Sequence, residues 1–179
     1  MSAVEEMGLQ VGQRVADFSA QALLADGSFK EVKLSDYKGK WVVIFFYPLD
    51  FTFVCPTEIQ SFNKKYSDFK KLGAEVIAAS TDSVYSHKAW VDNGLGKIQF
   101  PILGDTSHKV SRTFNVLLED KGIALRGTFI LDPSGVLKSA VVNDLPVGRS
   151  VEETLRTLQA LQTGKLTGCD WKPGDKTLN

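Results

Sequence analysis

The sequence predicts an α/β fold in which a mixed β-sheet is flanked by helices. An apolar run at 41–47, a helical periodicity over 56–72 and a second apolar run at 74–80 together indicate a βαβ unit. Two later strand-like runs are joined by a turn that contains proline and glycine. With 179 residues, of which 43% are hydrophobic, the chain is long enough to bury a core. We therefore expect a single domain over residues 1–179, ending in a tail at 165–179.

Charge and composition exclude several classes of function. Lysine plus arginine and aspartate plus glutamate number 21 each, and no basic block exceeds a lysine pair, so no nucleic-acid partner is indicated. Residues 1–6 lack the basic and apolar regions of a signal peptide, and the apolar run at 41–47 is too short to cross a bilayer. We therefore expect a cytoplasmic protein.

The βαβ unit is the most regular part of the sequence. The run at 41–47 follows a turn-like segment at 38–40 and consists of β-branched and aromatic residues, which suits a central strand covered on both faces. Gly73 ends the helix predicted over 56–72, and the run at 74–80 then returns to the sheet. The helical spacing is carried by Ile59, Phe62, Tyr66, Phe69 and Leu72.

The alternation of helix and strand continues through the middle of the chain. A helix is predicted over 84–91, ending near the Asn-Gly pair at 93–94. A short strand follows at 100–103, and another helix is expected to begin at Thr106 or Ser107.

A hairpin is predicted next, which adds antiparallel strands to the sheet. The strand-like runs at 124–131 and 136–142 flank the sequence DPSG at 132–135, whose proline and glycine are turn formers.

The last predicted helix begins at Ser150. Glu153 three residues later completes a capping-box pattern, leucines follow at helical spacing, and Gly164 supplies the stop. Cys169 lies beyond this helix in a polar tail, so we expect it outside the packed core.

Cys55 is open to four interpretations: a buried inert thiol, half of a structural disulfide, a metal ligand or a nucleophile. One other cysteine, far away in sequence, is too few for a disulfide framework, and no CxxC motif exists. A zinc site lacks the required ligand spacing because His87 and His108 fall on different predicted helices. The metal and structural-disulfide interpretations are therefore weak.

The position of Cys55 favours the nucleophile. Proline disfavours the α conformation in the residue before it but is tolerated in a first helical turn, so Pro56 puts Cys55 at the N-cap or first turn of the helix over 56–72. There the sulfur meets unpaired backbone N–H groups and the positive end of the helix dipole. The carboxyl end of a central strand is also where open α/β sheets build their sites. A buried, inert thiol remains the alternative.

The stretch FTFVCPTE at 51–58 resembles the active-site signature of the typical two-cysteine peroxiredoxins, the branch that includes thioredoxin peroxidases and the peroxidase component of bacterial alkyl hydroperoxide reductase. The likeness extends over nearly the whole chain. It implies a thioredoxin-like fold with peroxiredoxin-type additions, and a thiol-dependent peroxidase that reduces hydrogen peroxide and organic hydroperoxides in antioxidant defence. The supporting motifs are KW at 40–41, YP at 47–48, STDS at 80–83, RGTFI at 126–130 and WKPG at 171–174.

The resemblance assigns Cys55 as the sulfur that attacks the hydroperoxide and becomes a sulfenic acid. It implies that Arg126 stabilises the thiolate and donates to the peroxide, and that Thr52 hydrogen-bonds the peroxide. Arg126 lies in an apolar strand and cannot shed its charge, so it needs an anionic partner, which a thiolate would supply. A strand-edge arginine facing water and an ordinary capping threonine are the structural alternatives.

The same resemblance makes Pro48 a shield for the sulfur and pairs Glu58 with Arg149 around the site. Each has a structural alternative: Pro48 as a turn former, Glu58 as a first-turn partner of the helix dipole and Arg149 as a solvated surface charge.

Cys169 is expected to resolve the sulfenic acid, which condenses with a thiol to a disulfide. The resemblance implies that Cys169 comes from the other subunit of a homodimer, that dimers can form a decamer, and that a thioredoxin-like or flavoprotein disulfide reductase supplies electrons. No cofactor is expected, because the sequence has no Gly-rich nucleotide-binding fingerprint. A spectator thiol is the alternative for Cys169; for the chain, an oligomeric holdase chaperone or a peroxide-signal relay.

The tail departs from the family pattern. Cys169 is followed by Asp170 and Trp171, whereas such relatives more often have Cys-Pro and further residues before the tryptophan. The sequence ends at Asn179 without the Tyr-Phe pair of hyperoxidation-sensitive members, and their Gly-Gly-Leu-Gly reads NGLG at 93–96. A tail with fewer buried contacts should release Cys169 more readily, so we expect relative resistance to overoxidation.

Overall fold

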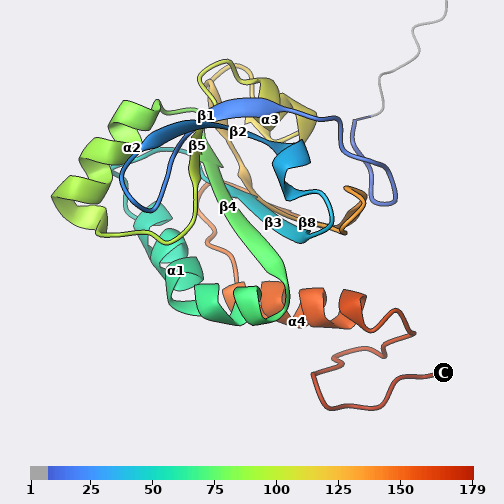
Figure 1. The fold of residues 1–179 in the computed structure, drawn as a ribbon. Helices are drawn as coiled ribbons and strands as arrows, with labels where there is room; N and C mark the ends of the chain where they lie inside the picture. Colours follow the sequence, from blue (N-terminus) through green and yellow to red (C-terminus); the bar gives the residue numbers. More distant parts are fainter. Residues whose placement is uncertain (1–7) are drawn as a thin grey trace, which may run out of the picture.

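The computed structural model describes residues 8–179 (Figure 1). The expectation drawn from residues 1–6 lies outside the described residues. Among residues 8–179, no helix has the length and apolar character needed to cross a membrane. The elements, in chain order, are β1 (Ser19–Leu23), β2 (Phe29–Lys33), η1 (Leu34–Tyr37), β3 (Trp41–Phe46), α1 (Cys55–Lys71), β4 (Ala74–Ser80), α2 (Val84–Trp90), η2 (Val91–Leu95), β5 (Ile102–Gly104), α3 (Lys109–Thr113), β6 (Leu117–Leu118), β7 (Ile123–Ala124), β8 (Arg126–Leu131), β9 (Leu137–Asn143) and α4 (Val151–Gln162).

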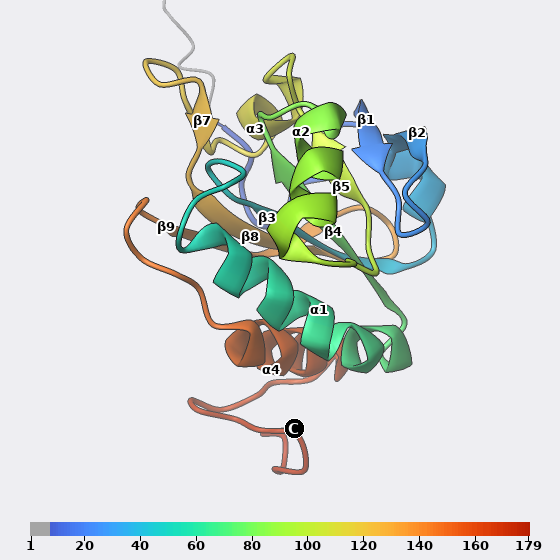
Figure 2. The ribbon, with the colours of Figure 1, turned by 90° about the vertical axis from the view of Figure 1, so that its left-hand side faces the viewer.

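Seven strands form one mixed sheet in the order β2-β1-β5-β4-β3-β8-β9. The pairs β3–β4 and β4–β5 are parallel, whereas β8 pairs antiparallel with both β3 and β9. Figures 1 and 2 show α1 and α4 packed side by side along one face of the sheet, with α3 on the opposite side. The predicted βαβ unit is β3–α1–β4, and its first strand is central as expected.

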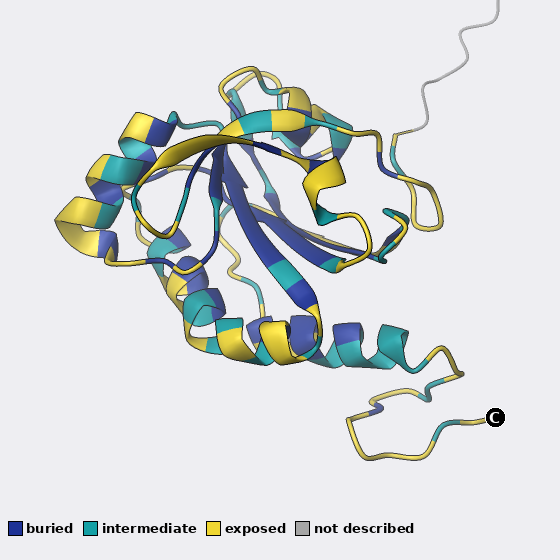
Figure 3. Cartoon of the chain, in the orientation of Figure 1, coloured by how far each residue is buried: buried dark blue, intermediate teal, exposed yellow. Residues whose placement is uncertain are grey.

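The central strand β3 is buried on both faces and divides the apolar interior in two. Val43 and Phe45 belong to the core beneath α1 and α4, whereas Val42 and Ile44 belong to the core on the α3 side. The rings of Phe45 and Phe62 stack with centroids 4.1 Å apart, which fixes α1 against the strand. Figure 3 shows the resulting dark, buried centre of the sheet.

The predicted strand at 124–131 is wrong in one respect, because the chain breaks it at Leu125. β7 pairs with β6 in a separate two-stranded ribbon, and the amide of Gly127 donates to the carbonyl of Leu125 in a tight turn (2.9 Å). β8 therefore starts at Arg126, which lies at the end of a sheet strand rather than within one. The hairpin from β8 to β9 is as predicted, with the Gly135 amide donating to the Asp132 carbonyl.

The helix expected to begin at Thr106 or Ser107 begins instead at Lys109. His108 takes a left-handed conformation (φ 61°), and the carboxylate of Asp105 accepts hydrogen bonds from the amides of Val110 and Ser111 at 3.1 and 2.8 Å. The side chain of Asp105 thus satisfies first-turn donors of α3, and the helix begins at Lys109.

Other boundaries shift by a residue or more. α2 ends at Trp90 and continues as the irregular turn η2, in which Gly94 has φ 136°. The strand expected at 100–103 is β5, Ile102–Gly104. At α4, the Ser150 side chain accepts from the Glu153 amide at 3.2 Å, which confirms the predicted N-cap.

The segment after α4 folds back on itself. Trp171 is buried, its carbonyl accepts a hydrogen bond from Arg156 (2.9 Å), and its indole N–H donates to the Asp175 carbonyl (3.1 Å). Cys169 beside it is exposed, as the sequence predicted.

Candidate functional site

The candidate site is built around Cys55, the first residue of α1. Val54 is the N-cap and contributes no side-chain cap, while Pro56 occupies the first turn, so the prediction for this helix start is confirmed. The helix runs for 17 residues away from the sulfur, whose residue is fully buried. Cys55 therefore lies where the N–H groups of a long helix are unpaired and the dipole favours an anion.

Arg126 brings a cation to this sulfur. The antiparallel register of β3 and β8, in which Phe45 faces Thr128, carries residue 126 to the end of β3, where the connection to α1 begins. Its Nη1 donates to the Cys55 sulfur at 3.3 Å and to Glu58 Oε2 at 2.8 Å, while its Nε donates to the Leu145 carbonyl at 2.6 Å. Two nitrogens of the guanidinium thus make three contacts and Arg126 is buried, so the alternative of an arginine facing water does not apply.

Glu58 and Arg149 form the second layer of the site. Glu58 lies one turn along α1 from Cys55, and its Oε1 accepts from both the backbone amide and the Nε of Arg149 at 3.2 and 3.0 Å. Arg149 also donates to the Gly127 carbonyl at 2.7 Å and to the Phe46 carbonyl. Burial lowers the pKa of Arg149, and the hydrogen bond to Glu58 opposes that shift. Arg149 is therefore not a solvated surface charge, and Glu58 does more than match the dipole of α1.

These contacts leave a buried imbalance of charge. The side chains of Arg126, Glu58 and Arg149 are 5%, 2% and 3% exposed, so water screens them little. Two guanidinium groups and one carboxylate leave one positive charge, and arginine does not give up its proton in proteins. An anionic sulfur at Cys55 would bring the cluster to neutrality.

Thr52 and Pro48 lie in the connection between β3 and α1. The Thr52 hydroxyl donates to the Leu49 carbonyl at 2.9 Å and does not cap α1. Since its proton is committed to Leu49, its lone pairs are what remain to accept a hydrogen bond. Pro48 is buried and Thr52 is half-buried.

A second polar cluster supports this connection, and the sequence analysis missed it. Asp50 accepts hydrogen bonds from the Tyr47 hydroxyl (2.7 Å) and pairs with His87 Nδ1 (2.7 Å), and all three side chains are buried. Burial, with the charge of Asp50, raises the pKa of Tyr47 well above its ordinary value. One signal was available, because Asp50 is the single charged residue between 41 and 54.

His87 is fully engaged in this cluster rather than in a metal site. Its Nε2 contacts the Leu103 carbonyl at 2.9 Å while Nδ1 contacts Asp50. Within residues 8–179, no group of three or more histidine, cysteine, aspartate or glutamate side chains is arranged to hold a metal ion.

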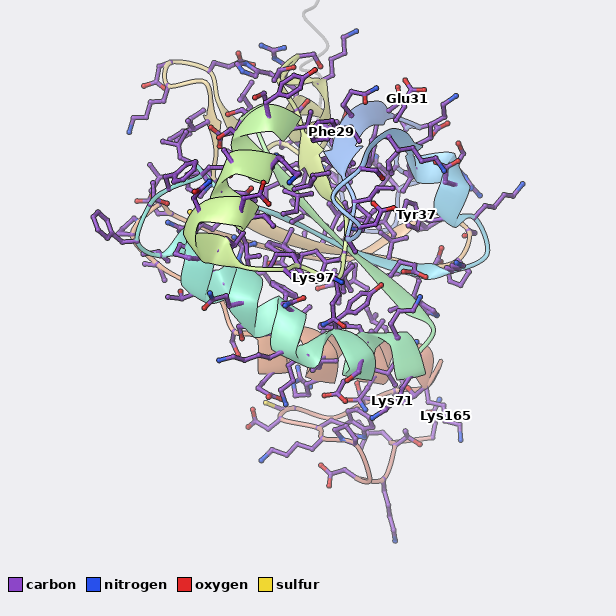
Figure 4. The ribbon with its side chains drawn as sticks, turned by 60° about the vertical axis from the view of Figure 1, so that its left-hand side comes forward. Phe29, Glu31, Tyr37, Lys71, Lys97 and Lys165 are labelled. Atoms are coloured by element: carbon purple, nitrogen blue, oxygen red, sulfur yellow. The ribbon has the colours of Figure 1, made fainter. Side chains whose placement is uncertain are left out.

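Cys169 is the predicted site residue that the chain does not bring to the others. It is exposed and lines a surface groove with Arg156 and Lys165, and both cysteines are free. Figure 4 shows Lys165 at the lower end of the molecule, beyond α4, whereas Phe29 and Glu31 mark the opposite end.

Known proteins resemble this chain over most of its length. Residues 11–140 match the family model described as the AhpC/TSA family. A protein named putative peroxiredoxin in rubredoxin operon, from Clostridium pasteurianum, is 53% identical over 174 residues, which cover 94% of this chain and 98% of the relative. Peroxiredoxin-2 of Mus musculus is 52% identical over 178 residues, covering 94% of this chain and 89% of that protein.

Two solved structures are similar over nearly their full length. The reduced 2-Cys peroxiredoxin of Plasmodium vivax superposes with a TM-score of 0.91 at 37% identity, covering 93% of this chain and 91% of that one. AhpC of Enterococcus faecalis gives 0.86 at 40% identity, covering 97% and 100%. These likenesses confirm the predicted thioredoxin-like fold with its mixed sheet.

Proposed function

Since the chain belongs to the AhpC/TSA family, and is thus a peroxiredoxin that reduces peroxides through a thiol with an antioxidant role, we propose that Cys55 is the attacking sulfur and Arg126 its cationic partner. One observation supports this assignment above the others. The Cys55 sulfur lies 3.3 Å from Arg126 Nη1, inside a buried cluster that carries one uncompensated positive charge.

Peroxide reduction at Cys55 is a displacement at oxygen. The Cys55 thiolate attacks the terminal oxygen of a hydroperoxide ROOH, the S–O bond forms as the O–O bond breaks, and the sulfur becomes a sulfenic acid. The leaving alkoxide takes up a proton and departs as an alcohol, or as water when the substrate is hydrogen peroxide. Arg126 stabilises the charge as it moves from sulfur to oxygen, because its guanidinium is already fixed by Leu145 and Glu58.

Thr52 and Pro48 complete the proposed substrate site. Because the Thr52 hydroxyl donates to Leu49, its oxygen is available to accept the O–H of the hydroperoxide and to orient the O–O bond toward sulfur. Pro48, buried at the start of the connection, excludes water from the sulfur. Glu58 and Arg149 act through Arg126 by holding its position.

We assign Cys169 to the second step. Its thiol attacks the sulfenic acid of Cys55, a disulfide forms and water leaves. As the family resemblance implies, we propose that this thiol belongs to a second copy of the chain, in a homodimer that can assemble further into a decamer; Cys169 is exposed and so accessible to such a copy. In this proposal residues 1–179 act as one domain, with 165–179 as the tail that carries Cys169. A thioredoxin-like or flavoprotein disulfide reductase then restores both thiols.

The test is peroxide consumption by the reduced, purified protein and two serine variants. Cys55→Ser is expected to consume no hydrogen peroxide or cumene hydroperoxide. Cys169→Ser is expected to consume one equivalent rapidly and to form no disulfide-linked dimer on a non-reducing gel. Consumption by Cys55→Ser at the rate of the parent protein would show that the assignment is wrong.

A further inference from the structure

Residues 48–54 lead from the end of β3 directly to the buried Cys55, and we call them the cover segment. Cys55 is fully buried, yet Phe51 and Phe53 in the cover segment are 56% and 95% exposed. Phe51 also has a left-handed backbone (φ 57°), which is unfavourable for an aromatic residue. The buried residues of the segment, Pro48 and Asp50, therefore have to hold two exposed aromatic residues and an unfavourable backbone conformation in place.

Asp50 is the polar anchor of the cover segment, and it is held at both its side chain and its main chain. The carboxylate contacts Tyr47 and His87, both at 2.7 Å. The backbone amide donates to Asp82 Oδ2 at 2.9 Å. The hydrogen bond from the Asp50 amide to Asp82 fixes the path of the main chain as it turns toward Phe51.

Asp82 is itself fixed to the sheet. It follows β4, and the hydroxyl of Ser80, the last residue of that strand, donates to the same Oδ2 atom at 2.8 Å. The Asp82 amide donates back to the Ser80 hydroxyl oxygen at 3.1 Å. Ser80 is buried, and its carbonyl accepts from the Asp105 amide at 2.8 Å. The carboxylate is therefore a rigid, charged acceptor offered to the cover segment by a neighbouring strand.

We propose that Asp82 is a positioning residue for peroxide reduction, whose carboxylate keeps the cover segment closed over Cys55 by holding the amide of Asp50. The inference deepens the proposed function, because Thr52, the proposed peroxide ligand, lies in the segment that Asp82 would hold. It also stands apart from that function, since the access of any reagent to Cys55 depends on the same bond.

The experiment compares two rates in the Cys169→Ser background, where Cys55 is the sole thiol of the chain. One rate is labelling by 5,5′-dithiobis(2-nitrobenzoate), a bulky reagent that needs the cover segment open. The other is oxidation by hydrogen peroxide in a single turnover. Asp82→Ala should label about tenfold faster or more, the factor that corresponds to one lost hydrogen bond with a charged acceptor. Its oxidation by peroxide should slow severalfold.

Two further variants separate positioning from general damage. Asp82→Asn keeps an oxygen acceptor without the charge, so it should recover part of both rates. Thr81→Val is the matched control, because it removes a hydrogen bond from the neighbouring residue to the Gly122 carbonyl (2.8 Å) without touching the cover segment. Both of its rates should stay within twofold of the parent, and melting temperatures are recorded for all variants.

The proposal is overturned if Asp82→Ala labels within twofold of the parent, or if Thr81→Val speeds labelling equally. Should Asp82→Ala fail to fold, Asp82→Asn decides: about threefold faster labelling supports the role, and unchanged labelling rejects it. If the parent protein is not oxidised by peroxide, the proposed function is refuted but the inference on Asp82 is not. The labelling rates still decide whether Asp82 holds the cover segment closed.

Discussion

Replacing Arg126 by methionine tests the charge balance at the sulfur most directly. Methionine keeps a long unbranched side chain at the start of β8 but removes the cation and all its donors. The Cys55 sulfur then loses its contact at 3.3 Å, while Glu58 keeps Arg149 as a partner. The buried cluster becomes neutral, so an anionic sulfur would leave it with one negative charge.

The size of the effect follows from the geometry. One hydrogen bond to a charged acceptor contributes about 1.5–3 kcal/mol. A ceiling comes from Coulomb's law, which gives about 5 kcal/mol for unit charges 3.3 Å apart at an effective dielectric constant of about 20. At about 1.4 kcal/mol per factor of ten, the second-order rate with hydrogen peroxide should fall by at least about tenfold and at most several thousandfold.

The assay is stopped-flow oxidation of the reduced protein, followed by tryptophan fluorescence. Trp90 is a suitable reporter because its ring lies 5.8 Å from the ring of Phe51, which belongs to the cover segment. Arg126→Lys should give an intermediate rate, since it keeps a charge but cannot reproduce the planar fork. The matched control is Arg112→Met, which removes an exposed arginine paired with Glu119 and should change nothing. A folded Arg126→Met protein within threefold of the parent rate would refute the charge-balance argument.

Substitutions at three further positions probe the substrate site, the core and the backbone. Thr52→Val should slow oxidation by hydrogen peroxide about tenfold or more while Thr52→Ser does not, as measured by stopped flow; equal rates would contradict the substrate role. Phe62→Ala removes a buried ring stacked on Phe45 and should lower the free energy of unfolding by about 3–5 kcal/mol in urea titrations, and a loss below about 1 kcal/mol would be inconsistent with the packing. Gly127→Ala should lower the melting temperature, because its Cβ would lie 2.6 Å from a ring carbon of Phe129, and an unchanged melting temperature would argue against this close approach.

The sequence predicted those parts of the fold whose signal is continuous along the chain. The run that became β3 is apolar at every position because both of its faces are covered, and it was predicted as central for that reason. The edge strand β2 was missed because, of its residues, Val32 alone is buried, so neither an apolar run nor a clear alternation marks it. Edge strands carry charges that protect them from pairing, which removes the pattern that would reveal them.

Two boundaries were predicted wrongly because a backbone group found a different hydrogen-bond partner from the one that the sequence pattern suggests. The helix after β5 starts at Lys109 rather than at a serine or threonine, because Asp105 supplies the acceptors for its first turn. The strand at 124–131 breaks because Leu125 bonds to Val116 and Gly127, and β7 finds its partner in β6. In the second case the partners, Val116 and β6, lie outside the predicted strand, so a pattern within 124–131 could not show them.

Some features of the candidate site could likewise be predicted from the sequence, and others could not. Pro56 fixed Cys55 at a helix start from sequence alone, and that placement is confirmed. The contact between Arg126 and Cys55 depends on the register of β3 with β8, and the acceptor that orients Arg126 is the main-chain carbonyl of Leu145, which any residue type would provide. Because every residue has a main-chain carbonyl, the sequence pattern could not show that Leu145 would supply this acceptor. The roles of Thr52 and Cys169 stay predictions.

Because Cys55 is buried and Cys169 is exposed, peroxide reduction and disulfide formation would need the cover segment in different states, closed for the first and open for the second. A disulfide requires the two Cα atoms to approach within about 7 Å, yet Cys55 is enclosed at the first turn of α1 and Cys169 lies on the surface beyond α4. Peroxide reduction as proposed uses the closed arrangement, in which Arg126 contacts the sulfur, whereas disulfide formation requires the first turn of α1 and the cover segment to open. A sulfenic acid held too long in the closed site is exposed to further oxidation by a second peroxide. Substitutions at Asp82 that loosen closure should therefore slow the reduction of peroxide and also lower the amount of sulfinic acid formed at Cys55. Mass spectrometry at rising peroxide concentration would show whether both decrease in the same variants.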